Sequence, residues 1–253
     1  MATKRSGATG YWEQTRDFAN SLVLTAPLFV FYQVGILFTS GWMNGADFFS
    51  HRLIGMLGGN VGVYTMINLA ILATFGFLYI RLRSERALTR DTALWLVVES
   101  TVYAILLGVL VVQGLLALGF SPPLSASVVA AAGGAPHEMG VFDAIVLSVG
   151  AGTYEELVFR VFLLGGLLWL LLRWGARPWV AGLSALILSS LVFSAAHYVP
   201  FGMDPWELWS FAFRFAMGIA FGLLYWLRGF AVAVYTHTIY DILILVPRAL
   251  VGG

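Results

Sequence analysis

Two adjacent carboxylates and an arginine lie inside an apolar stretch of the sequence, GTYEELVFRVF at 152–162. A charged side chain at membrane depth costs roughly 2.5 to 3.5 kcal/mol on insertion scales, so Glu155, Glu156 and Arg160 are not expected by chance. Residues four apart share a helix face, so Glu156 is spaced to pair with Arg160 and Glu155 is not. We therefore expect Glu155 to face a cavity as a general base.

Two histidines and an aspartate stand in other apolar runs. His197 ends the run LVFSAAHYV, and His237 is followed four residues later, on the same helix face, by Asp241. A lone histidine at the end of a span is more often an interfacial residue, and a Glu–Arg pair alone can merely fasten two helices. Together, however, four such groups lie on three spans that are otherwise nearly free of charge, and they favour one shared polar site: Glu155, His197, His237 and Asp241.

Several kinds of hydrolytic chemistry can be weighed against these residues. The chain has no cysteine, which excludes disulfides, thiolate metal sites and a cysteine nucleophile. It contains neither a GxSxG nucleophile elbow nor an HExxH zinc motif, although Glu155, His197 and His237 could supply three zinc ligands. The remaining chemistry is activation of water by a carboxylate–imidazole pair, with other donors stabilising the oxyanion.

The composition is that of an integral membrane protein. Hydrophobic residues make up 60% of the chain and charged residues only 11%, and the mean hydropathy is +0.86. A net charge of +1 gives no reason to expect a nucleic-acid partner. The N-terminus is polar, and the first apolar run begins near Ser21 without a cleavage site, so we expect a retained first span.

The apolar runs predict an all-α, polytopic membrane bundle of seven or eight transmembrane helices. The run 141–173 would be about 50 Å long as one helix, too long for a straight span. Gly150 and Gly152 predict a break there, with a short lead-in helix followed by a span over 153–174. The other expected spans are at about 18–40, 61–80, 92–119, 179–199, 207–227 and 230–250.

The basic residues predict the orientation of the chain. With seven spans, the basic N-terminal tail, the segment 81–90, the loop 173–177 and Arg228 all fall on one side, which is then the cytoplasm. The small-residue stretch 121–140 is expected as an external loop. We expect a bacterial inner-membrane protein with a cytoplasmic tail (1–20), N-terminal transmembrane helices (21–120) and a catalytic core (141–250).

Three short motifs resemble those of a known superfamily. EELVFR (155–160), FSAAH (193–197) and HTIYD (237–241) are similar to the EExxxR, FxxxH and HxxxN/D motifs of the CAAX protease and bacteriocin-processing (CPBP) superfamily of intramembrane endopeptidases, which includes the Ras-converting CAAX endopeptidase. The resemblance extends over about 141–246. The N-terminal stretches SLVLTAPLFVFYQVGIL and NGADFF resemble a myxosortase-like sub-branch, although Gln33 stands where that sub-branch has an acidic residue.

The resemblance implies roles for these residues. Glu155 and His197 would activate water as a glutamic rather than metal-dependent protease without a cofactor, and His237 and Asp241 would form or orient the oxyanion site. Many members have Asn where this chain has Asp241, and an ionised carboxylate there would repel the oxyanion. Asp241 must therefore be protonated or accept from a His237 N–H. The implied framework residues are Glu156, Arg160 and Phe193.

The expected activity is cleavage of a peptide bond near the C-terminus of a membrane-associated or exported protein. The alternatives are a zinc-dependent version of this protease and a non-catalytic membrane protein such as a bacteriocin-immunity factor. Glu155 and His197 lie about 18 and 20 residues from the loop at 173–177, or about 27 to 30 Å, so we expect a site that opens outward. His237 is only nine residues past Arg228, so its span must begin deep in the membrane.

Overall fold

The protein is helical throughout the part of the chain that the structure describes, as the sequence predicts. The computed structural model describes residues 10–39, 61–82, 88–122, 139–198 and 206–252; most of the expected external loop 121–140 lies outside them. The elements are α1 (Tyr11–Arg16), α2 (Phe18–Gly35), η1 (Ile36–Phe38), α4 (Val61–Leu82), α5 (Arg90–Ala117), α6 (Val141–Glu156), η3 (Leu157–Leu164), α7 (Gly165–Arg173), α8 (Pro178–Ala196), α9 (Leu208–Arg228) and α10 (Phe230–Gly252).

Six helical segments in these ranges are long and apolar enough to cross a membrane. Their outward faces carry large apolar side chains, as expected where lipid replaces water as the solvent. The protein is therefore an integral membrane protein. The segments are Phe18–Phe38, Thr65–Leu82, Asp91–Ala117, Pro178–Ala196, Leu208–Arg228 and Phe230–Val251.

The predicted helix break at Gly150 and Gly152 is wrong. Helix α6 runs through both glycines and continues through η3, a π-helical segment, into α7, so residues 141–150 do not form a separate lead-in helix. The glycines instead allow close packing. A Cβ at Gly150 would lie 2.2 Å from the ring of Tyr32, and one at Gly152 would lie 2.1 Å from the hydroxyl of Thr238. Small residues bring helices together at such contacts in membrane proteins.

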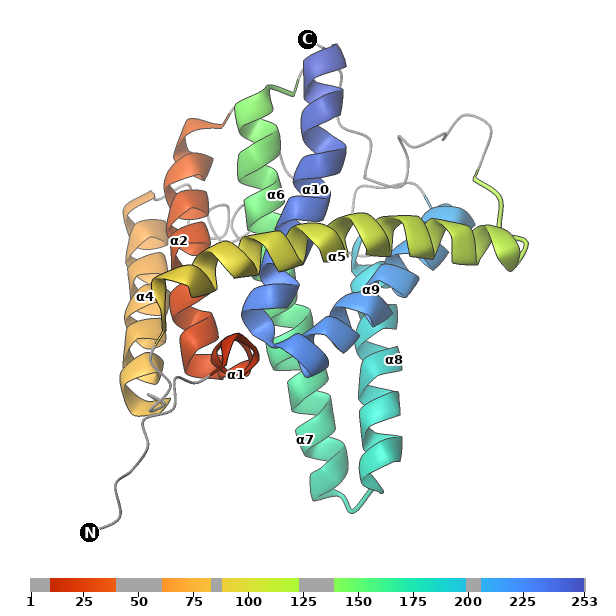
Figure 1. Cartoon of the computed structure of the whole chain (residues 1–253), viewed down its shortest axis with the longest axis horizontal. Helices are drawn as coiled ribbons and strands as arrows, with labels where there is room; N and C mark the ends of the chain where they lie inside the picture. The colour runs from red at the N-terminus through yellow and green to blue at the C-terminus, as the bar shows by residue number, and fades with distance from the viewer. Residues whose placement is uncertain (1–9, 40–60, 83–87, 123–138, 199–205, 253) are drawn as a thin grey trace.

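The helices are arranged around this long composite helix (Figure 1). Helices α2, α4, α6 to α7, α8 and α10 run in roughly one direction, whereas α5 lies across them. Helix α5 contacts α1, α9 and α10. It has 28 residues and is the longest single helical element in the described ranges, shorter only than the composite helix of α6, η3 and α7.

Three helix ends that carry basic residues lie in the same half of the molecule. Arg16 ends α1, Arg173 ends α7 and Arg177 precedes α8. Figure 1 shows these helix ends in the lower half of the view, with the C-terminus of α10 at the top. This arrangement is the one that the positive-inside argument requires, although which end faces the cytoplasm stays a prediction.

The turn between α9 and α10 lies nearer the middle of the molecule than the tip of the α7–α8 hairpin, which projects beyond it (Figure 1). Helix α10 therefore starts part-way along the bundle. This offset explains how His237 reaches the other polar residues although it is only nine residues past Arg228.

Candidate active site

Glu155 lies at the meeting point of three helices. It is in the last turn of α6 and is 7% exposed. Its Oε1 atom is 3.9 Å from Nε2 of His197, just after α8, and its Oε2 atom is 3.7 Å from Nε2 of His237 in α10. Both distances exceed that of a direct hydrogen bond, and gaps of this size are commonly bridged by water. The residues that the sequence singled out are thus gathered around one carboxylate.

Glu156 has two partners and is fully buried. Its Oε2 atom is 3.0 Å from Nε of Arg160, the pairing that the four-residue spacing predicts. Its Oε1 atom is 2.9 Å from Nδ1 of His237, a contact that the sequence reasoning missed. Glu156 therefore joins the framework arginine to a histidine that faces Glu155.

Arg160 is held by charge and by packing. Its guanidinium carbon lies 4.8 Å from the ring centroid of Phe193. Within the described residues none of its N–H groups is aligned for a hydrogen bond, so its contact with Glu156 is an ion pair. Phe193 also packs edge-on against His197, with ring centroids 5.2 Å apart. Phe193 thus connects the buried cation to the site.

The two histidines each have one ring nitrogen engaged. Nδ1 of His197 is 2.9 Å from the carbonyl oxygen of Phe193, which can only accept, so Nδ1 carries the proton. In His237, Nδ1 faces the Glu156 carboxylate and the ring stacks on Phe221 at 4.5 Å and 14°. In both residues Nε2 is therefore the atom left for chemistry: a proton acceptor when the imidazole is neutral and a donor when it is protonated.

Asp241 flanks His237 on the side away from Glu156. Its Oδ2 atom is 3.5 Å from Nε2 of His237. The Asp241 side chain is 23% exposed, whereas that of Glu156 is fully buried. The position suits an acceptor for a His237 N–H, one of the two states that the sequence leaves open for this residue.

Sequence reasoning missed Arg214 of α9. It is 7% exposed, and its guanidinium carbon is 5.3 Å from the ring centroid of Tyr198. It is close enough to interact electrostatically with His197 and Asp241. The sequence signal for Arg214 is its position within an apolar run, where an arginine costs as much free energy as a glutamate does.

A buried polar network immediately before Glu155 was missed as well. Tyr154 donates a hydrogen bond to Oδ1 of Asn68 at 3.1 Å and accepts one from the side-chain amide of Gln33. This network ties α2, α4 and α6 together. The available signal was the presence of two amide side chains, Gln33 and Asn68, in apolar runs.

No group of three or more His, Asp or Glu side chains within the described ranges has the arrangement of a metal site. The zinc alternative would use Glu155, His197 and His237, whose donor atoms do face one another.

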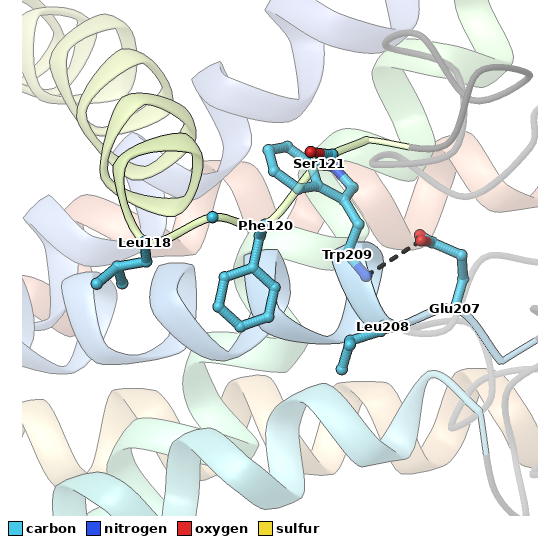
Figure 2. A pocket seen from close by; sticks show the side chains of 7 residues that line it. Leu118, Phe120, Ser121, Glu207, Leu208 and Trp209 are labelled. Atoms are coloured by element: carbon cyan, nitrogen blue, oxygen red, sulfur yellow. Dashed lines mark hydrogen bonds between the residues drawn. The ribbon is translucent and has the colours of Figure 1, made fainter.

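A pocket of about 300 Å³ lies elsewhere, between the end of α5 and the start of α9 (Figure 2). Glu207 at its rim accepts hydrogen bonds from the backbone N–H groups of Trp209 and Ser210 and so caps α9. No residue of the glutamate–histidine cluster lines this pocket, so it is not part of the candidate site. Its lining is Leu118, Gly119, Phe120, Ser121, Glu207, Leu208 and Trp209.

Comparison with protein families supports the resemblance. Residues 137–243 match the family model described as type II CAAX prenyl endopeptidase Rce1-like. This part of the chain is an Rce1-like domain. All three motifs fall inside it, which confirms the assignment to the CPBP superfamily. The Rce1-like domain covers less than half of the chain and leaves out α1, α2, α4 and α5. Neither a curated protein nor a solved structure was found to match the chain.

Proposed function

We propose that the protein is an intramembrane glutamic endopeptidase that cleaves a peptide bond near the C-terminus of a membrane-associated protein. The observation that carries this proposal is that the two adjacent glutamates have different partners. Glu156 is fully buried and bound to Arg160 and His237, whereas Glu155 faces the Nε2 atoms of two histidines.

In the proposed reaction a water molecule lies between Glu155 and His197. Glu155 takes a proton from the water while the oxygen attacks the carbonyl carbon of the substrate. The oxyanion of the tetrahedral intermediate is stabilised by an N–H at Nε2 of protonated His237, which Glu156 and Asp241 keep cationic. The C–N bond then breaks as the proton held by Glu155 passes to the leaving amine, and the carboxylate is restored.

Two substrate classes fit this chemistry: a prenylated protein with a CAAX-type end, as the family description suggests, and an exported protein with a C-terminal sorting tail. Glu155 lies 14 residues after Val141 and 18 before Arg173, or about 21 and 27 Å along the helix. The site is thus somewhat nearer the end away from the basic residues. This position favours the exported substrate.

The test replaces Glu155 by Gln, which keeps the shape of the side chain and removes the base. We expect cleavage to be abolished, with C-terminal peptides of the substrate accumulating uncut in the membrane proteome. Asp91→Asn, which alters an exposed carboxylate on α5, is the matched control and should cleave normally. Near-normal turnover by the Gln variant would overturn the base assignment. Identical membrane proteomes with and without the protein would favour a non-catalytic role such as immunity.

A further inference from the structure

A buried ion pair lies at the turn that starts α10. Arg228 is 2% exposed, and its Nε and Nη2 atoms donate to the two carboxylate oxygens of Glu99 in α5 at 2.5 and 2.7 Å. Two parallel N–H···O bonds between a guanidinium and a carboxylate fix both groups in orientation. The sequence places Arg228 with the basic residues of the predicted cytoplasmic side. The structure adds that its charge is neutralised inside the protein by Glu99.

Helix α1 closes over this ion pair. Tyr11 donates a hydrogen bond to Oε2 of Glu99 at 2.5 Å, and the ring of Trp12 lies 3.5 Å from the guanidinium carbon of Arg228. Burial and the neighbouring Glu99 raise the pKa of Tyr11, so the phenol stays a donor at neutral pH. We call these four residues, Tyr11, Trp12, Glu99 and Arg228, the N-terminal clamp.

The backbone of the turn also fits against α1. Gly229 has a φ of +97°, and a Cβ there would lie 2.4 Å from the carbonyl oxygen of Thr15 and 3.0 Å from Cα of Arg16. Only glycine tolerates both the positive φ and this approach. The turn is therefore packed directly on the backbone of α1.

The residues from this turn to the active site are tightly held. Residues 230–234 of α10 are at most 2% exposed, and Tyr235 donates a hydrogen bond to the carbonyl oxygen of Leu24 in α2 at 2.9 Å. His237 follows two residues later. Because packed helical segments move as units, a displacement of the α9–α10 turn also displaces the imidazole of His237.

We propose that the N-terminal clamp positions His237, so that helices outside the Rce1-like domain set the geometry of the site inside it. The four clamp residues are positioning residues, and their effect on cleavage rests on the proposed function. Loss of the clamp lets the start of α10 shift, which moves Nε2 of His237 away from Glu155 and Nδ1 away from Glu156.

The first test measures turnover of two double variants, Tyr11→Phe with Trp12→Leu and Glu99→Gln with Arg228→Met. Positioning acts on the transition state, so we expect kcat to fall about tenfold while KM changes by less than about twofold. When Trp12→Phe takes the place of Trp12→Leu in the first double variant, an aromatic ring remains over the guanidinium, and most of the wild-type kcat should be recovered. Trp95→Leu, which changes an exposed tryptophan of α5, is the control and should not alter kcat.

The second test does not depend on cleavage. The Nδ1–H proton of His237 gives an NMR signal in protein labelled with ¹⁵N-histidine, and it is assigned by its loss in His237→Gln. We expect this signal to shift or broaden in the clamp variants and to stay unchanged in Trp95→Leu. If the wild type cleaves nothing, the proposed function fails while this signal still decides the role of the clamp.

Folded clamp variants with unchanged kcat, KM and His237 signal would overturn the proposal. If a double variant does not fold, Tyr11→Phe alone removes a single hydroxyl, and its kcat, KM and His237 NMR signal are measured instead. A shift of the His237 signal in this variant supports a positioning role for the N-terminal clamp, and an unchanged signal refutes it.

Discussion

Glu156 performs two tasks, of which the sequence spacing reveals only the pairing with Arg160. It balances the charge of Arg160 and accepts a hydrogen bond from Nδ1 of His237, both without exposure to solvent. A substitution at Glu156 therefore changes stability and chemistry together. Stability and turnover must be measured separately to tell these effects apart.

Arg160→Ala removes one of the two cationic partners of the buried Glu156 carboxylate. Removing one partner of a buried pair typically costs about 3 to 5 kcal/mol, so we expect a clear loss of thermal stability in detergent. The double change Glu156→Gln with Arg160→Met removes both charges and should recover part of that stability. It should not recover turnover, because the charged acceptor for His237 is also lost. No recovery of stability would contradict a paired role for these two residues.

Catalysis without a metal is a second prediction at this scale. Prolonged dialysis of the purified protein against a strong chelator should leave cleavage intact, because water activation is assigned to Glu155 and His197. The zinc-dependent alternative predicts the opposite result. Activity lost on dialysis and restored by zinc would make Glu155, His197 and His237 metal ligands.

The sequence could predict individual charged residues because charge in an apolar run is costly and hence noticeable. Helical spacing predicted the contact between Glu156 and Arg160. The contact between Glu156 and His237 joins α6 to α10, and no spacing within one helix could predict it. The partner of Arg228 was missed for a related reason: Glu99 lies on another helix.

At the scale of elements, close helix packing decides how the site is built. Gly152 places α6 against α10 at Thr238, the residue after His237. The sequence could predict where most helices lie, because long apolar runs are unmistakable. It could not tell a glycine that breaks a helix from one that lets two helices touch, because both look the same within one run.

Gly152→Ala should destabilise the protein. The added Cβ would lie 2.1 Å from Oγ1 and 2.7 Å from the backbone nitrogen of Thr238, and overpacking of this kind costs about 1 to 3 kcal/mol. Because the contact adjoins His237, turnover should fall too. Gly166→Ala in α7 is the matched control, since nothing lies within 4 Å of its Cβ, and it should leave melting temperature unchanged or raise it. Equal melting temperatures for the two variants would show that the α6–α10 contact is not tight.

For the whole molecule the basic residues predict an orientation in the membrane. The alternation of basic helix ends predicts that the α7–α8 tip faces the cytoplasm and the C-terminus of α10 faces outward. Charge patterning can predict such an orientation. It could not predict that α5 lies across the bundle or that the α9–α10 turn is recessed, because both follow from packing between distant helices.

The absence of native cysteine allows a direct test of the orientation. Val251→Cys, at an 89% exposed position, and Arg177→Cys lie at opposite ends of the molecule. In intact cells an impermeant maleimide should label the first and not the second, and permeabilised cells should label both. The reverse pattern would turn the site toward the cytoplasm and make a CAAX-type substrate the better proposal.

The π-helical segment after Glu156 also fixes the rotation of the chain that follows it. A π-helix bonds each residue to the fifth one along, so the segment winds more loosely than the α-helices on either side. Each residue turns an α-helix by about 100°, so deleting one from 157–164 would rotate α7 relative to the glutamates. Helix α7 packs on α8, and the deletion would turn this packed face away from its partner.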